Sequence, residues 1–142
     1  PVDGWDIYVN FVTGDPSGTV IDLTTGWQIT DGFYLGLNAA DYSASGEDAG
    51  GYTGVALYPQ LKTSDAFSIG LRGELFGTHA KDVDDLPSVF SATLTGSYTI
   101  ENLTIKPEIR LDSWSNDEPY FDADGEASQS LAAFTLAAIY AF

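Results

Sequence analysis

The chain has 142 residues, the length of one domain, and its 21 Asp and Glu against 5 Lys and Arg give a net charge of −16. This charge argues against nucleic-acid binding, which needs a basic surface. The chain contains no Cys, which excludes disulfides and thiol chemistry. No run of residues approaches the roughly 18 apolar residues of a transmembrane helix. Met is also absent, so we expect that Pro1 is not the translated amino terminus and that a signal peptide has been removed or the chain begins mid-protein.

Alternation of apolar and polar residues predicts an all-β protein. The predicted strands are, in chain order, 5–13, 19–29, 33–42, 52–62, 66–77, 89–100, 103–114 and 130–142. Asp31-Gly32 is the strongest hairpin signal between them. Pro59 falls inside a predicted strand although it cannot donate a ladder hydrogen bond, and a bulge is one way to accommodate it.

The two faces of these strands differ in chemistry. One row of each strand is apolar and almost free of charge, while the opposite row is rich in Ser, Thr, Asn, Gln, Tyr and Gly. A soluble barrel would place its apolar row inside and would usually show Lys and Glu outside. The pattern therefore favours a lipid-facing exterior over the solvated face of an ordinary soluble sheet. We predict one domain over residues 1–142, an eight-stranded antiparallel up-and-down transmembrane β-barrel with an apolar exterior and a polar lumen.

Charges on the polar rows predict a network inside the lumen. Its expected members are Asp22, Lys62, Arg72, Glu74, Lys106, Glu108, Arg110 and Asp112. Strand 89–100 offers only Ser and Thr between the charged strands, so we expect long side chains to pair across it. Such pairing is expected because an unpaired buried charge is very costly.

Loop lengths predict an orientation. Tight turns follow the second, fourth and sixth strands, whereas long acidic loops follow the third, fifth and seventh. In outer-membrane barrels the short turns are periplasmic, so both termini should be periplasmic. Aromatic residues of the apolar rows then form a girdle at the periplasmic rim: Trp5, Trp27, Phe33, Phe67, Tyr98, Tyr140 and Phe142.

No catalytic site is predicted. His79 is the sole histidine, and no G-x-S-x-G nucleophile motif is present. The loop acids Asp82, Asp84, Asp85, Asp117, Glu118, Asp122, Asp124 and Glu126 are expected to bind divalent cations weakly, because clustered carboxylates reduce their mutual repulsion by sharing a hard cation. Asp122, Asp124 and Glu126 are candidate ligands for weakly bound calcium, although their spacing departs from a complete calcium loop and a solvated acidic loop is the alternative. We expect no other cofactor.

The segments GFYLGLNAADYS, GYTGVALYPQLKTSDAFSIGLRGELF, LTGSYTIENLTIKPEIRLD and SLAAFTLAAIYAF resemble the closing strands of OmpL-like β-barrel porins of Gram-negative bacteria. The resemblance covers roughly residues 32–142 and extends less clearly over 5–31. It implies a pore-like protein of the outer membrane. The final aromatic strand also resembles the signal that the barrel-assembly machinery reads. Members of the family have more strands than eight, so the chain is expected to be a shortened, engineered or partial relative.

Two functions are compatible with these observations. The first is a porin-like barrel of the bacterial outer membrane, with a passive transport or pore-forming role and a narrow or plugged lumen. The second is a structural or adhesive barrel whose acidic loops or apolar exterior mediate protein–protein assembly. The expected partners are outer-membrane lipid and the barrel-assembly machinery, with homo-oligomers left open and nucleic acid excluded.

Overall fold

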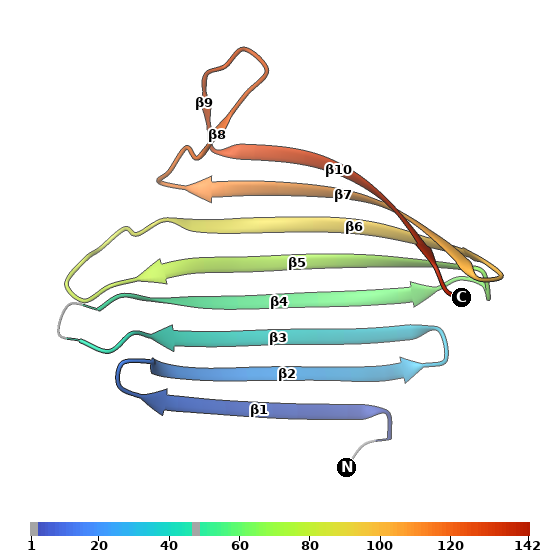
Figure 1. Ribbon diagram of the computed structural model, residues 1–142, viewed down its shortest axis with the longest axis horizontal. Helices are drawn as coiled ribbons and strands as arrows, with labels where there is room; N and C mark the ends of the chain where they lie inside the picture. The colour runs from blue at the N-terminus through green and yellow to red at the C-terminus, as the bar shows by residue number, and fades with distance from the viewer. Residues whose placement is uncertain (1–2, 47–48) are drawn as a thin grey trace.

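The computed structural model describes residues 3–46 and 49–142, and most of them lie in one antiparallel sheet of eight strands (Figure 1). The strands follow the order β1-β2-β3-β4-β5-β6-β7-β10, so each pairs with its neighbour in the chain apart from a small hairpin inserted before the last. Their bounds are β1 Trp5–Gly14, β2 Gly18–Thr30, β3 Phe33–Ser43, β4 Gly51–Lys62, β5 Phe67–His79, β6 Ser88–Ile100, β7 Leu103–Ser115 and β10 Ser130–Tyr140.

The connections differ in length at the two ends of the sheet. Short turns join β2 to β3, β4 to β5 and β6 to β7, and Figure 1 shows them together at one end, which we call the turn end. The long connections after β3, β5 and β7 lie at the opposite end, the loop end. Strand β1 begins and β10 finishes at the turn end, as the alternation of loop lengths predicted.

The segment after β7 contains a small hairpin that the sequence did not indicate. Strands β8, Tyr120–Phe121, and β9, Ala127–Ser128, pair with each other outside the main sheet. Each has two residues, which is too short for an alternating pattern to be visible. Within the described ranges, no helix is long and apolar enough to cross a membrane.

A register that is constant apart from one shift near the β2–β3 turn keeps each residue row on one face. Directly opposed residues of antiparallel strands share a face. One such row reads Tyr8, Thr24, Asn38, Ala56, Glu74, Ser91, Asp112 and Leu131 from β1 to β10. The neighbouring row reads Ile7, Thr25, Leu37, Leu57, Gly73, Ala92, Leu111 and Ala132. We call the side of the first row the polar face and the side of the second the apolar face.

Two prolines lie in inner strands without shifting this register. The β4–β5 ladder skips Pro59, and the β6–β7 ladder skips Pro107, but the pairings on either side of each gap keep the same offset. Pro59 is therefore accommodated without a bulge: the missing N–H removes a ladder contact without adding a residue. The register instead shifts between Gln28 and Thr30, next to the Asp31-Gly32 turn.

The sheet is a single layer and has almost no hydrophobic core. Ala56 is the one buried apolar core residue among the described positions, and the largest fully buried side chain is Ser91. The accessible surface is 9793 Å², whereas a compact monomer of this mass would expose about 7,100 Å². The excess includes large residues of the apolar face that are 45–69 % exposed: Val9, Phe11, Leu57, Leu71, Leu75, Phe90, Leu94, Ile109, Leu111, Phe134 and Leu136.

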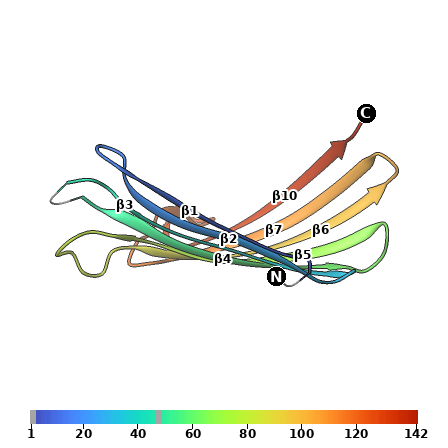
Figure 2. The ribbon, with the colours of Figure 1, turned by 90° about the horizontal axis from the view of Figure 1, so that it is seen from below.

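The described sheet is open, which differs from the closed barrel that the sequence predicted. Strands β1 and β10 form its two edges and do not pair with each other across residues 3–46 and 49–142. Figure 2 shows a twisted, gently curved sheet, and Figure 1 shows β1 and β10 at its two opposite edges. Closing an eight-stranded sheet requires much stronger coiling, with the strands tilted and staggered around an axis. All-β class, strand order and antiparallel up-and-down topology are confirmed, and closure is not.

Tyrosines of the polar face lie against glycines of adjacent strands. A Cβ atom added at Gly36 would overlap the ring of Tyr58, and one added at Gly26 would overlap the hydroxyl end of Tyr34. Each glycine thus makes room for an aromatic ring that covers the bare backbone beside it. In a sheet without a core, these ring-on-backbone contacts supply packing between strands.

We predict that Gly36→Ala lowers the free energy of unfolding by about 1–3 kcal/mol, the usual cost of overpacking. Gly70→Ala is the matched control, because its nearest neighbour would be the Gln60 Cγ atom at 3.7 Å, an ordinary contact. Denaturant titration of both variants measures the difference. Equal stability of the two variants would show that Tyr58 does not need the space above Gly36.

Candidate functional site: the polar face

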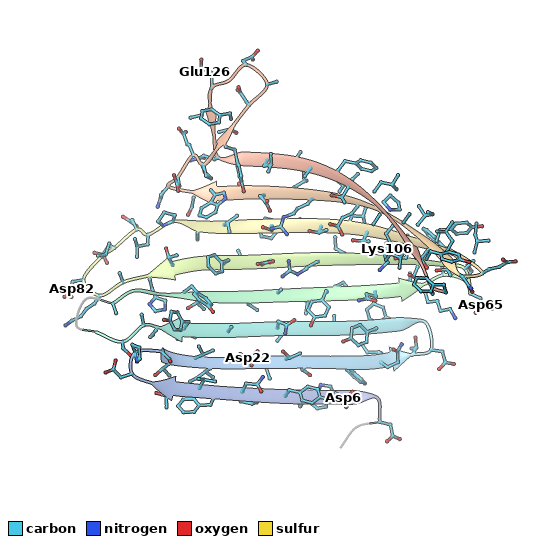
Figure 3. The ribbon with its side chains drawn as sticks, in the orientation of Figure 1. Asp6, Asp22, Asp65, Asp82, Lys106 and Glu126 are labelled. Atoms are coloured by element: carbon cyan, nitrogen blue, oxygen red, sulfur yellow. The ribbon has the colours of Figure 1, made fainter. Side chains whose placement is uncertain are left out.

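The polar face carries the charged and hydrogen-bonding side chains that the sequence assigned to a lumen. They come from β2 to β7 and lie between the turn end and the loop end. Figure 3 shows Asp22 midway along β2 and Lys106 towards the turn end, whereas Asp82 and Glu126 lie on the connections of the loop end. Asp22 in the middle of the sheet therefore lies apart from the acids of the loop-end connections.

Two ion pairs occupy the half of the polar face formed by β5, β6 and β7. Arg72 pairs with Glu74 on β5, and the Nε atom of Arg110 lies 2.9 Å from Oδ1 of Asp112 on β7. An Nη2 atom of Arg110 also donates to the Ser91 hydroxyl on β6, at 2.9 Å. The register sets the two arginines in one row and the two acids in the next, on either side of β6.

These pairs run along strands and not across β6, which differs from the expected network. Residues two apart on a strand point to the same face and are direct neighbours, so each arginine meets an acid of its own strand first. The small residues Ser91 and Thr93 of β6 separate the two pairs, and Ser91 bonds to only one of them. The result is two local pairs in place of one network.

The other predicted lumen charges have separate partners. Lys62 Nζ lies 2.8 Å from the turn residue Asp65, and this hydrogen bond lowers the pKa of the exposed Asp65 carboxyl. Asp22 accepts a hydrogen bond from Asn10, and Glu108 accepts one from Thr95 at 2.7 Å. Lys106 lines a hollow of about 440 Å³, and Arg72 and Glu108 line the same hollow.

A chain of neutral hydrogen bonds crosses the other half of the polar face. The Tyr58 hydroxyl donates to Oδ1 of Asn38 at 2.6 Å, and Nδ2 of Asn38 donates to the Thr24 hydroxyl at 2.6 Å. The chain links β4, β3 and β2. Asn38 thus uses both ends of its amide, which fixes the orientation of its side chain.

Aromatic side chains of the polar face gather at the loop end. The ring centroids of Tyr42 and Tyr52 are 5.3 Å apart, and those of Tyr52 and Phe76 are 5.5 Å apart. The alternation of the sequence already contained this signal, because all three residues fall on rows otherwise occupied by polar residues. The alternation assigns no role to them, because it does not show which aromatic side chains of neighbouring strands come into contact.

The predicted girdle residues lie near the turn end. Trp5 opposes Trp27 with ring centroids 6.5 Å apart, Phe67 opposes Tyr98, and Tyr140 opposes Leu103. Phe33 pairs with Leu61 in the same region, and Phe142 follows the end of β10. Their contact with an interface between lipid and water stays a prediction.

In the acidic segment after β7, the Asp122 carboxylate binds backbone N–H groups of the turn between β8 and β9. Oδ1 of Asp122 accepts hydrogen bonds from the backbone N–H groups of Asp124 and Glu126, each at 2.9 Å. No group of three or more His, Asp or Glu residues in the described ranges is placed to hold a metal ion. Weak calcium binding by Asp122, Asp124 and Glu126 stays a prediction of the sequence.

His79 lies at the loop end of β5, near an acid of β3. Its Nε2 atom is 3.6 Å from Oδ2 of Asp41, and the Thr53 hydroxyl donates to that same oxygen at 2.7 Å. The hydroxyl is therefore oriented towards the acid and not towards the imidazole. The expectation that the chain has no catalytic site stays a prediction.

A family model described as putative beta-barrel porin-2, OmpL-like, matches residues 3–142. The chain belongs to this family. The match includes both the clear resemblance over residues 32–142 and the weaker one over residues 5–31. Comparison with curated proteins and with solved structures gives no significant match. The family agrees with the fold, because its name denotes a β-barrel and the eight strands of this OmpL-like chain form an up-and-down sheet.

We predict that Arg110→Ala destabilises the protein more than Arg72→Ala. The Asp112 side chain is 10 % exposed and that of Glu74 is 23 % exposed, so Asp112 loses more when its partner is removed. A buried acceptor left unpaired costs about 1–3 kcal/mol, and a charged one costs more. Denaturant unfolding of both variants measures the order.

Two controls accompany this comparison. Lys62→Ala should leave stability unchanged, because its partner Asp65 is fully exposed. Arg110→Ala combined with Asp112→Ser should recover part of the loss, because the unpaired carboxylate is gone. A double variant no more stable than Arg110→Ala would show that the arginine acts through its packing.

Proposed function

We propose that this chain is a porin-like barrel of the Gram-negative outer membrane, with a passive, pore-type role and a narrow lumen. The observation that carries the proposal is the division of one sheet into an apolar and a polar face without a second layer to cover either. Membership of a porin family supports the same reading. On this proposal the apolar face contacts lipid and the polar face lines the lumen.

Lipid is the occupant that the apolar face fits best. An exposed apolar surface of this extent marks a membrane or protein interface. The four strand-borne cations, Lys62, Arg72, Lys106 and Arg110, lie on the polar rows, where lipid does not reach on this proposal. At the centre of a bilayer, a Lys or Arg facing lipid would cost about 2–4 kcal/mol.

A membrane-inserted sheet must also pair its edges. Unpaired N–H and C=O groups cost several kcal/mol each in hydrocarbon, which is why membrane-spanning sheets are closed. Strand β1 runs towards the loop end and β10 runs away from it, so the two edges can pair antiparallel. Neither edge contains Pro, Lys or Arg, the residues that natural sheets use to block edge pairing. We therefore propose that β1 and β10 pair in the membrane.

Because the chain has no cysteine, paired cysteines introduced at Val9 of β1 and Leu136 of β10 can test this closure. In detergent-folded protein we expect a short bismaleimide reagent to join them within one molecule, giving a monomer band that migrates faster than the untreated chain. The control pair, Val9→Cys with Leu71→Cys on the inner strand β5, should not crosslink.

The other outcomes of the crosslinking experiment are also informative. A crosslinked dimer would show that two copies share their edges and would favour the assembly function over the monomeric barrel. A monodisperse protein that is stable in buffer without detergent, and that gives no crosslink, would contradict the membrane proposal.

We predict little steady conductance from the detergent-purified protein in a planar bilayer. An eight-stranded barrel has an interior just wide enough for its side chains, and the Arg72–Glu74 and Arg110–Asp112 pairs would occupy it. Replacing Arg72 and Glu74 together with Ala should raise the conductance, because both long side chains are removed without leaving a lone charge. A large, stable conductance of the unmodified protein would show that an aqueous channel already exists.

A further inference from the structure

We propose that the polar face contains a binding site for one neutral sugar ring, beside the aromatic residues of the loop end. The inference deepens the proposed porin-like function by naming a class of solute, and it rests on that function only for the idea that solute reaches this face. The site is a hollow of about 180 Å³ between β2 and β5. We call it the mouth hollow.

Small residues form the floor of the mouth hollow. Ala40 of β3 and Gly54 and Ala56 of β4 lie on the polar face, where their neighbours Asn38, Tyr52 and Tyr58 carry large side chains. The volume fits one six-membered ring, since a cavity of about 150 Å³ holds benzene.

Aromatic rings border the mouth hollow on its loop-end side. Tyr52 and Phe76 line it, and Tyr42 extends the ring cluster beyond Tyr52. These rings cannot belong to a lipid-facing girdle, because they point to the face opposite the exposed apolar residues. No second layer of the described sheet covers them. They are therefore available to a solute that carries an apolar surface.

Charged and polar side chains surround the rest of the mouth hollow. Asp22 and Asn38 line one side, and Arg72 and Glu74 line the other. Asp22 accepts from Asn10 through Oδ1 alone, which leaves Oδ2 available. Arg72 has five N–H donors and meets a single acid, so further donors remain. The hollow thus offers both an acceptor and donors to hydroxyl groups.

A pyranose matches this combination of surfaces. Its C–H face is apolar and packs on an aromatic ring, while its hydroxyl groups both donate and accept hydrogen bonds. The two carboxylates of the hollow outnumber its one guanidinium, and the whole chain has a net charge of −16. An anionic solute is therefore disfavoured, and a neutral saccharide is the class that fits.

Saturation-transfer NMR tests the proposal on folded protein in a detergent without a sugar headgroup. Irradiation of the aromatic protons should transfer saturation to the ring protons of glucose, and less to glucuronate. Tyr52→Ala should weaken glucose binding about two- to tenfold, as expected for the loss of one stacking contact. Tyr52→Phe should retain binding, because the ring is kept.

Two further variants separate the mouth hollow from other surfaces. Asp22→Asn should weaken binding, because a charged group with two acceptor oxygens is replaced by a neutral amide with one. Phe121→Ala is the aromatic control, since this exposed residue lies on the loop-end hairpin, outside the hollow. It should leave glucose binding unchanged. Denaturant unfolding checks that each variant is folded, and binding is compared only between proteins with the same unfolding midpoint.

Absence of saturation transfer to glucose in the folded wild-type protein would overturn the sugar site, as would equal transfer in wild type and Tyr52→Ala. Binding in micelles does not require a pore or a closed barrel. A membrane barrel that does not bind glucose would therefore contradict the proposed sugar site and leave the proposed membrane function unaffected. A chain that is soluble without detergent and binds glucose through Tyr52 would contradict the membrane proposal alone.

Discussion

A single antiparallel sheet has two faces and no interior, and this constraint governs the whole protein. Its strands are held by the backbone ladder and by contacts between side chains of neighbouring strands. Slipping one strand by one residue would move its whole apolar row to the other face. The constant register from β2 to β10, interrupted only near Gln28, is therefore what keeps lipid-compatible and polar residues apart.

The polar face is divided into two chemically different halves. From β2 to β4 it is mostly neutral, with Tyr58, Asn38 and Thr24 in one hydrogen-bonded chain. From β5 to β7 it carries two ion pairs around the small residues of β6. Hydrogen-bonded side chains of both halves have fixed positions although no core surrounds them. A face organised in this way can present defined groups to a solute, which a randomly solvated surface cannot do.

Much of the fold could be predicted from the sequence, because its determinants are local. Alternation and turn residues such as Asp31-Gly32 placed the ends of every long strand to within about two residues. Whether a residue holds an odd or an even position in its strand was enough to assign it to a face. The acids with which Arg72 and Arg110 pair could not be predicted in the same way. A long side chain on a strand can turn towards a residue of its own strand or towards one of the next strand. The rings over Gly36 and Gly26 depend on rotamers, which the sequence pattern does not contain.

On the proposed function, closing the sheet and inserting it into a membrane are physically coupled. In water the edges of the open sheet can bond to solvent, but the apolar face stays exposed. In hydrocarbon the apolar face is satisfied, but roughly ten backbone groups along each outer edge would lack a partner. Neither environment satisfies the open sheet completely. Pairing β1 with β10 would give these backbone groups partners while the apolar face stays in contact with lipid, so the closed form is the one that the proposed membrane function requires.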